Sequence, residues 1–141
     1  MLERLVILGI LIVLVVLAVV VVRAWTRARA GRLTRGSPEP LWRQLGTTPD
    51  GRQTVIAFST PACAACHTAQ RPALELLEQQ LGVQSVRVIH VDAARQPEVA
   101  RVFGVLTVPS TVVLAQSGYV AAVNQGFTPA PRLAAQLATT H

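Results

Sequence analysis

Residues 55–66 read VIAFSTPACAAC and join an apolar run to two cysteines. The apolar run that ends in this stretch, over residues 53–59, predicts a buried strand. Cys63 and Cys66, the two cysteines of the chain, follow where the strand pattern gives way to a helical one. The stretch therefore predicts a buried strand that leads directly into a cysteine pair on the first turn of a helix.

The spacing of the two cysteines has chemical consequences. Residues three apart on a helix have Cβ atoms about 5 to 6 Å apart, and modest tightening gives the roughly 4 Å of a disulfide. A helix N-terminus favours anions, so we expect the Cys63 thiol to ionise below the value of about 8.5 of a free thiol. Cys63 is then the attacking thiolate, and Cys66 resolves the mixed disulfide. Two helix starts fit the sequence: Thr60 caps the helix with Pro61 as its first residue, or the helix begins at Cys63.

The rest of the chain supplies the elements of one α/β domain. We expect the helix to run to Leu81, because leucines recur at spacings of three and four, and to kink at Pro72. The other patterns predict helices over residues 41–45, 96–103 and 131–139, and strands over 85–91, 111–115 and 119–124. Strands and helices that alternate, followed by a hairpin and a last helix, predict a mixed sheet flanked by helices.

These features resemble the thioredoxin superfamily over residues of about 50 to 138, around the cysteine pair and again at residues 107–111, TVPST. The resemblance implies a thioredoxin-like fold and a thiol-disulfide oxidoreductase of the protein disulfide reductase type. It implies Cys63 and Cys66 as catalytic residues, and Pro109 as a cis-proline that faces them. Val108, just before it, would offer backbone hydrogen bonds to an extended substrate peptide.

The resemblance also sets expectations for cofactors and partners. The redox-active Cys63–Cys66 disulfide would be the redox centre, with no cofactor and no metal. The partners would be protein thiols and disulfides together with an unidentified electron donor, and we expect the protein to be a monomer.

Several residues depart from the pattern of the family. Ala57 stands where thioredoxin itself keeps a buried acid, and Ala62 replaces the aromatic residue before the first cysteine. The pair Ala64-Ala65 separates the cysteines, and Pro72 falls one residue later than the family would place it. Neither the reduction potential nor the direction of exchange follows from this sequence.

Residues 5–22 form eighteen positions without a charged or polar side chain. At about 1.5 Å rise per residue a helix of this length covers about 27 Å, close to the hydrocarbon thickness of a bilayer. We therefore expect one transmembrane helix over residues 5–22. Residues 1–36 would form this anchor and its Arg-rich flank, and residues 37–141 the thioredoxin-like domain.

The positive charge of the chain lies at this boundary. Residues 1–36 carry six Arg and one Glu, whereas residues 37–141 carry seven Arg and six acids, out of a formal net charge of +6. A domain with so little net charge does not indicate nucleic-acid binding. Because five of the Arg follow the apolar segment, the positive-inside rule places the domain in the cytoplasm. The alternative is the extracytoplasmic face, where many anchored relatives of this superfamily work.

Three other interpretations compete. Cys63, Cys66 and His67 also form a CxxCH motif, which attaches c-type haem, but the only methionine available as a second axial ligand is Met1. A zinc site needs four ligands, and these three residues leave one position unfilled. A non-catalytic binding module would use the groove beside Pro109 and leave the cysteines idle. The role of His67 stays open.

Overall fold

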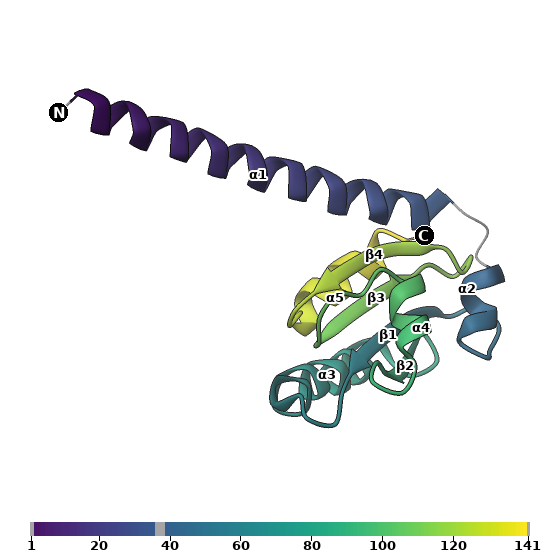
Figure 1. The fold of residues 1–141 in the computed structure, drawn as a ribbon. Helices are drawn as coiled ribbons and strands as arrows, with labels where there is room; N and C mark the ends of the chain where they lie inside the picture. The colour runs from purple at the N-terminus through teal and green to yellow at the C-terminus, as the bar shows by residue number, and fades with distance from the viewer. Residues whose placement is uncertain (1, 36–38, 141) are drawn as a thin grey trace. The chain divides into compact units, whose positions relative to one another are not determined.

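The computed structural model describes residues 2–35 and 39–140 (Figure 1). The domain boundary predicted at residue 37 lies outside the described residues. The chain divides into two compact units, Met1–Arg32 and Leu33–His141. The second unit holds the whole sheet and the cysteine pair, and it is the part that the site depends on.

The first helix, α1, spans Leu2–Arg35. Every residue from 9 to 24 is exposed, so apolar side chains lie on all sides of the helix over about four turns. Within the described part of the chain, no helix was found to be long and apolar enough to cross a membrane. The anchor over residues 5–22 therefore stays a prediction from the sequence.

The second unit is built on a four-stranded mixed sheet, with strand order β2-β1-β3-β4. The strands are β1 (Gln53–Ser59), β2 (Val86–Asp92), β3 (Ser110–Leu114) and β4 (Val120–Gln125). β1 is parallel to β2 and antiparallel to β3, and β3 pairs with β4 as a hairpin. The predicted thioredoxin-like mixed sheet is confirmed, and β1 has the bounds expected from its apolar run.

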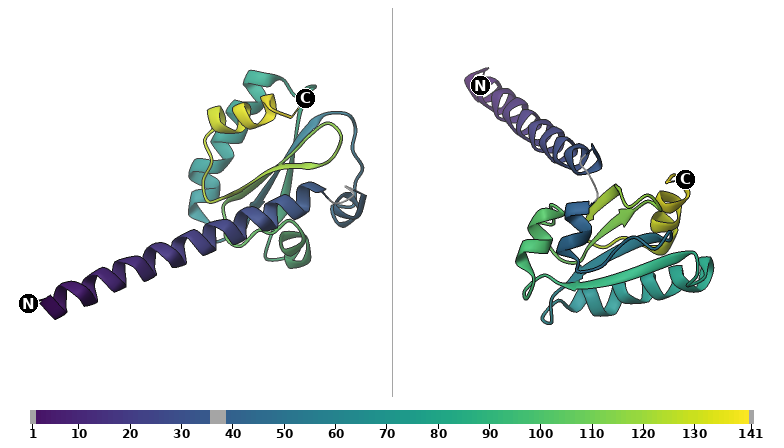
Figure 2. Two further views of the ribbon diagram at one scale, coloured as in Figure 1. Left: turned by 90° about the horizontal axis from the view of Figure 1, so that it is seen from above. Right: turned by 90° about the vertical axis from the view of Figure 1, so that its right-hand side faces the viewer.

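Helices cover both faces of this sheet (Figure 1, Figure 2). α3 (Arg71–Leu81) and α5 (Ala130–Ala138) pack on one face, and α2 (Glu39–Gln44) and α4 (Pro97–Val102) on the other. Each face thus buries its own apolar cluster, and the central strand β1 contributes to both because its side chains alternate.

The face under α3 and α5 forms the core next to the cysteine helix. Leu74 and Leu77 of α3 and Leu133 of α5 are buried against Val55 and Val113 of the sheet. The helix ends at Leu81, as the leucine spacing predicted, and this last residue is 37% exposed. Gly82 follows with a φ of 81°, a conformation that favours glycine, and its N–H bonds to the Glu78 carbonyl.

The opposite face is held by aromatic residues. Phe58 of β1 and Phe103, just after α4, lie with ring centroids 6.0 Å apart in the core. The Trp42 side chain of α2 is buried beside them, and its Nε1–H donates a 3.0 Å hydrogen bond to the Gly118 carbonyl at the β3–β4 turn. This bond ties the first helix of the domain to the hairpin.

Candidate active site

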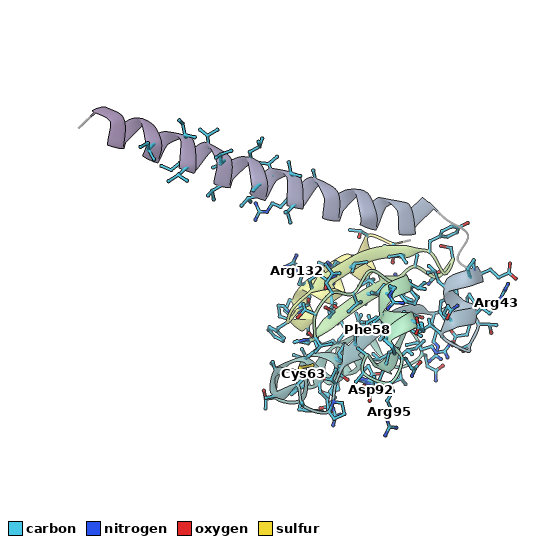
Figure 3. The ribbon with its side chains drawn as sticks, in the orientation of Figure 1. Arg43, Phe58, Cys63, Asp92, Arg95 and Arg132 are labelled. Carbon is cyan, nitrogen blue, oxygen red and sulfur yellow. A yellow bond between two sulfur atoms is a disulfide. The ribbon has the colours of Figure 1, made fainter. Side chains whose placement is uncertain are left out.

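Cys63 and Cys66 form a disulfide, with their Cα atoms 5.3 Å apart. They follow the carboxyl end of β1 and precede α3, and Figure 3 labels Cys63 in this segment. Cys63 is half-buried, whereas Cys66 is only 5% exposed. The geometry therefore gives one accessible sulfur and one shielded sulfur in the order that the sequence predicted.

A turn, not a capped helix, leads to the first cysteine. The backbone N–H of Cys63 donates to the Thr60 carbonyl at 3.1 Å, and the first helical residues are Ala64 and Ala65. Both helix starts derived from the sequence are therefore wrong, because Cys63 lies one position before the helix. The cysteine still stands at the helix N-terminus, where backbone N–H groups lack helical partners.

The helix widens directly after the cysteine pair. Residues Cys66–Gln70 form a π-helical turn, η1, in which the Arg71 N–H bonds to the Cys66 carbonyl five residues back. Such a turn holds one residue more than an α-helical turn. The wide turn lies between the cysteine pair and Pro72.

The widened turn lies directly before Pro72, where the sequence predicted a kink. Pro72 is the second residue of α3, and the helix runs without a break from η1 into α3, with Gln70 and Arg71 both in the right-handed helical region. A proline inside a helix lacks the N–H that would bond to a carbonyl of the preceding turn, and a π-helical turn is one of the irregularities found at such positions. The irregularity of the helix therefore adjoins the proline.

One backbone amide is aimed at the accessible sulfur. The N–H of Cys66 donates to Sγ of Cys63 at 3.2 Å. When the disulfide is open, a donor in this position stabilises negative charge on the sulfur and favours the thiolate. The local geometry thus supports Cys63 as the sulfur that carries charge.

His67 lies beside the pair and is exposed. Its Nε2 lies 3.3 Å from the Pro61 carbonyl and donates to it. The other histidine of the region, His90, lies in β2, which is an edge strand, and it is exposed.

Gln70 is a residue of the site that the sequence did not indicate. Its side chain is buried, and its amide pairs with the backbone of Thr128, with Nε2 donating to the carbonyl at 3.0 Å and Oε1 accepting from the N–H at 2.9 Å. The pairing joins the π-helical turn to the segment between β4 and α5. No pattern in the sequence around Gln70 indicated this burial.

The Val108–Pro109 peptide bond is cis, as the resemblance implied. Ser110 follows it and pairs with Phe58 in the register of β3 and β1. Since β1 ends one residue later at Ser59, the cis peptide and the cysteine turn lie at the same end of the sheet. Val108 is half-buried and Pro109 is buried.

The side chain of Gln125 holds the segment that carries this peptide bond. Its Nε2 donates to the Gly104 carbonyl at 2.9 Å, and its Oε1 accepts from the Leu106 N–H at 3.1 Å and from the Ser110 hydroxyl at 3.2 Å. The Ser110 hydroxyl also lies 2.7 Å from the Thr107 carbonyl.

Across residues 2–35 and 39–140 there is no group of three His, Cys, Asp or Glu side chains that could hold a metal ion.

Comparisons with known proteins agree with this geometry. A protein-family model described as thioredoxin matches residues 47–139. No curated protein matches the chain.

Solved structures with similar folds include a mutant thioredoxin from Halobacterium salinarum NRC-1, with 22% identity, a TM-score of 0.58, and 65% of this chain and 77% of that chain covered. For Fasciola hepatica thioredoxin the identity is 20%, the TM-score 0.56, and the coverage 73% and 90%. For dsbF of MTB, in mixed oxidised and reduced forms, the identity is 17% and the TM-score 0.51, with 64% of this chain and 82% of that chain covered. At these identities the similarity shows the fold.

Proposed function

The chain belongs to the thioredoxin family, and on this premise we propose that it is a thiol-disulfide oxidoreductase acting on protein disulfides. The observation that carries the proposal is the Cys63–Cys66 pair, closed as a disulfide at the end of β1. One sulfur is accessible and has a backbone N–H aimed at it, and the other is buried. This asymmetry is what a nucleophile and a resolving thiol require.

The reaction proceeds in two exchanges when the pair starts reduced. The Cys63 thiolate attacks a target disulfide and forms a mixed disulfide, while the other target sulfur leaves as a thiolate and takes up a proton. The Cys66 thiol then loses its proton and attacks the sulfur of Cys63. The mixed disulfide breaks, and the second target sulfur leaves. Two electrons have passed to the target, and the pair ends as the disulfide seen here.

The substrate groove in this proposal lies beside Val108 and Pro109. The cis peptide bond and the cysteine turn share one end of the sheet. An extended target segment placed there would bond to the backbone of Val108 while its disulfide meets Cys63. The pair is returned to the dithiol state by a dithiol electron donor, and a cytoplasmic position would favour net reduction because thiols there are kept reduced.

Residues 5–22 tether the enzyme to a membrane in this proposal, with the domain on the cytoplasmic side. Support comes from the eighteen apolar positions, from the exposed apolar side chains around α1, and from the five Arg between positions 23 and 35. Carbonate washing of cell membranes tests the tether, and protease treatment of intact cells tests the side. Release of the chain by carbonate would contradict the membrane tether. Cleavage of the domain by protease outside the cells would contradict its cytoplasmic position.

The activity is tested with the full chain in detergent micelles, by reduction of insulin disulfides with dithiothreitol as the electron source. We expect catalysed insulin precipitation that the variant Cys63→Ser abolishes, with circular dichroism to show that the variant is folded. Equal rates for parent and variant would contradict the proposal. A folded parent without activity would favour a binding module with idle cysteines, and a covalent haem spectrum would favour the CxxCH interpretation.

A further inference from the structure

A small hollow lies directly behind the buried sulfur. It measures about 20 Å³, and it is lined by the end of β1, by Cys66, His67 and Gln70 of η1, by the start of α3, and by His90 of β2. That volume is enough for one water molecule where polar groups surround it. Cys66 therefore borders a space that also reaches the side chains of His67, Gln70, Arg71 and His90.

A second hollow adjoins the first on the outside of the domain. It measures about 330 Å³, and it lies between α3 and the edge strand β2. Its lining residues are Arg71, Leu74, Glu75, Glu78 and His90. Three residues, Arg71, Leu74 and His90, line both hollows. They mark the place where the space behind Cys66 meets the solvent.

The strand geometry explains why His90 faces this space. Side chains alternate along a strand, and Val86 and Val88 of β2 both pack in the cluster under α3 and α5. His90 is the next position on that face. Its register partner on β1 is Ala57, which also lines the inner hollow.

Cys66 must lose a proton before it resolves the mixed disulfide, and few of the lining groups can accept it. β1 contributes Ala57, Phe58 and Ser59 to the inner hollow, none of which is a base at neutral pH. The guanidinium of Arg71 stays protonated, and the amide of Gln70 is already paired with Thr128.

The remaining titratable groups differ in position. Glu75 and Glu78 of α3 line only the outer hollow, and His67 of η1 lines only the inner one. The Nε2 of His67 is engaged with the Pro61 carbonyl. Of the residues that line both hollows, Arg71, Leu74 and His90, only His90 has a side-chain nitrogen that can accept a proton.

We infer that His90 accepts the proton of Cys66, through a water in the inner hollow, when Cys66 attacks the mixed disulfide. The inference rests on the proposed function and adds a proton route to it. In this step the Cys66 S–H bond breaks and the proton passes through the water to the His90 ring. The Cys66–Cys63 bond forms, and the target sulfur leaves with the electron pair of the broken mixed disulfide. His90 then releases the proton to solvent through the outer hollow.

The two exchanges can be timed separately with 5,5′-dithiobis(2-nitrobenzoate), because the chain has only two cysteines. One equivalent of the reagent is mixed in a stopped-flow instrument with the reduced full chain in micelles. Attack by Cys63 releases the first coloured thiolate, and resolution by Cys66 releases the second. Cys66→Ser identifies the phases, because it should release only the first.

His90→Gln is the decisive variant, with His67→Gln as its matched control. For His90→Gln we expect an unchanged first phase, a second phase about tenfold slower at neutral pH, and loss of the inflection in the pH profile of that second phase. His67→Gln should keep both the second phase and its inflection. The inference would be overturned if the pH profile of the second phase were unchanged in His90→Gln. It would also be overturned if the inflection of the second phase were lost only in His67→Gln. Absence of the first phase in the parent would contradict the proposed function instead.

Discussion

The side-chain amide of Gln70 pairs with the backbone of Thr128 in both directions, with N···O distances of 3.0 and 2.9 Å. Both residues are buried. The pair connects the π-helical turn of the cysteine helix to the chain that enters α5. It is therefore the direct polar link between the cysteine pair and the segment after β4.

Gln70→Leu should lower the free energy of unfolding by about 2 to 4 kcal/mol, because it leaves a buried backbone N–H and a buried carbonyl of Thr128 without partners. Urea unfolding followed by circular dichroism measures the change. Gln79→Leu, at an exposed position of α3 whose side chain makes no hydrogen bond within residues 2–35 and 39–140, is the control and should change little. Equal stability of Gln70→Leu and the parent would show that the pairing does not hold the turn.

The π-helical turn shows where sequence reasoning reaches its limit. The late position of Pro72 was visible in the sequence, but a periodicity of leucines cannot tell a kinked helix from a helix with one wide turn. Only the bond from the Arg71 N–H to the Cys66 carbonyl distinguishes them. Gln70 is the last residue of this turn, and its burial could not be predicted from the leucine spacing.

Gln125→Ala should loosen the segment that carries Val108 and Pro109, because it removes the contacts of the Gln125 side chain with Gly104, Leu106 and Ser110. We expect KM for insulin to rise and the first phase with the small aromatic disulfide to stay unchanged, since only a protein target uses the groove. Steady-state kinetics measure both. Gln116→Ala, at an exposed position of the β3–β4 turn, is the control. An unchanged KM would argue against a role of this segment in binding.

Trp42→Phe should cost about 1 to 3 kcal/mol of stability, because the Gly118 carbonyl loses its buried donor while most of the ring is retained. Urea midpoints of the two proteins give the difference. Tyr119→Phe, at the neighbouring exposed position, is the matched control, and its midpoint should not move. A loss of similar size in both variants would mean that the indole hydrogen bond is not the cause.

Asp50 should make stability depend on acid pH. The side-chain hydrogen bond from Arg52 lowers the pKa of Asp50, and the Arg52 backbone N–H and the charges of Arg52 and Arg87 act in the same direction. A pKa that is lower in the folded state stabilises the fold above the unfolded value, and the gain is lost as the pH falls through the folded value. Asp50→Asn should therefore be less stable than the parent at pH 7, with a difference that shrinks below a pH of about 4.

Urea midpoints of Asp50→Asn and the parent between neutral and acid pH check this prediction. Glu75→Gln, whose carboxylate makes no hydrogen bond among the described residues, is the control for the loss of one negative charge. A constant difference between Asp50→Asn and the parent across the range would contradict the assigned cause.

Much of the fold follows from local patterns. The apolar run of β1 has the same bounds in the sequence and in the structure, residues 53–59, because a central strand is buried on both faces and shows no alternation to misread. What the local patterns do not show falls at boundaries and edges. Leu81 is exposed because its helix ends there, and His90 is exposed because β2 is an edge strand. Strand order is not encoded in the local pattern of β2, so this exposure required the tertiary structure.

The central claim is that Cys63 attacks and Cys66 resolves. Its most direct test is to mix reduced Cys66→Ser and reduced Cys63→Ser, each as the full chain in micelles, with insulin, and to determine the mass of the products under non-reducing conditions. We predict a stable adduct of insulin at Cys63 in the Cys66→Ser variant and almost none in the Cys63→Ser variant, whose remaining thiol is buried. Equal adducts in both variants, or an adduct only at Cys66, would contradict the account.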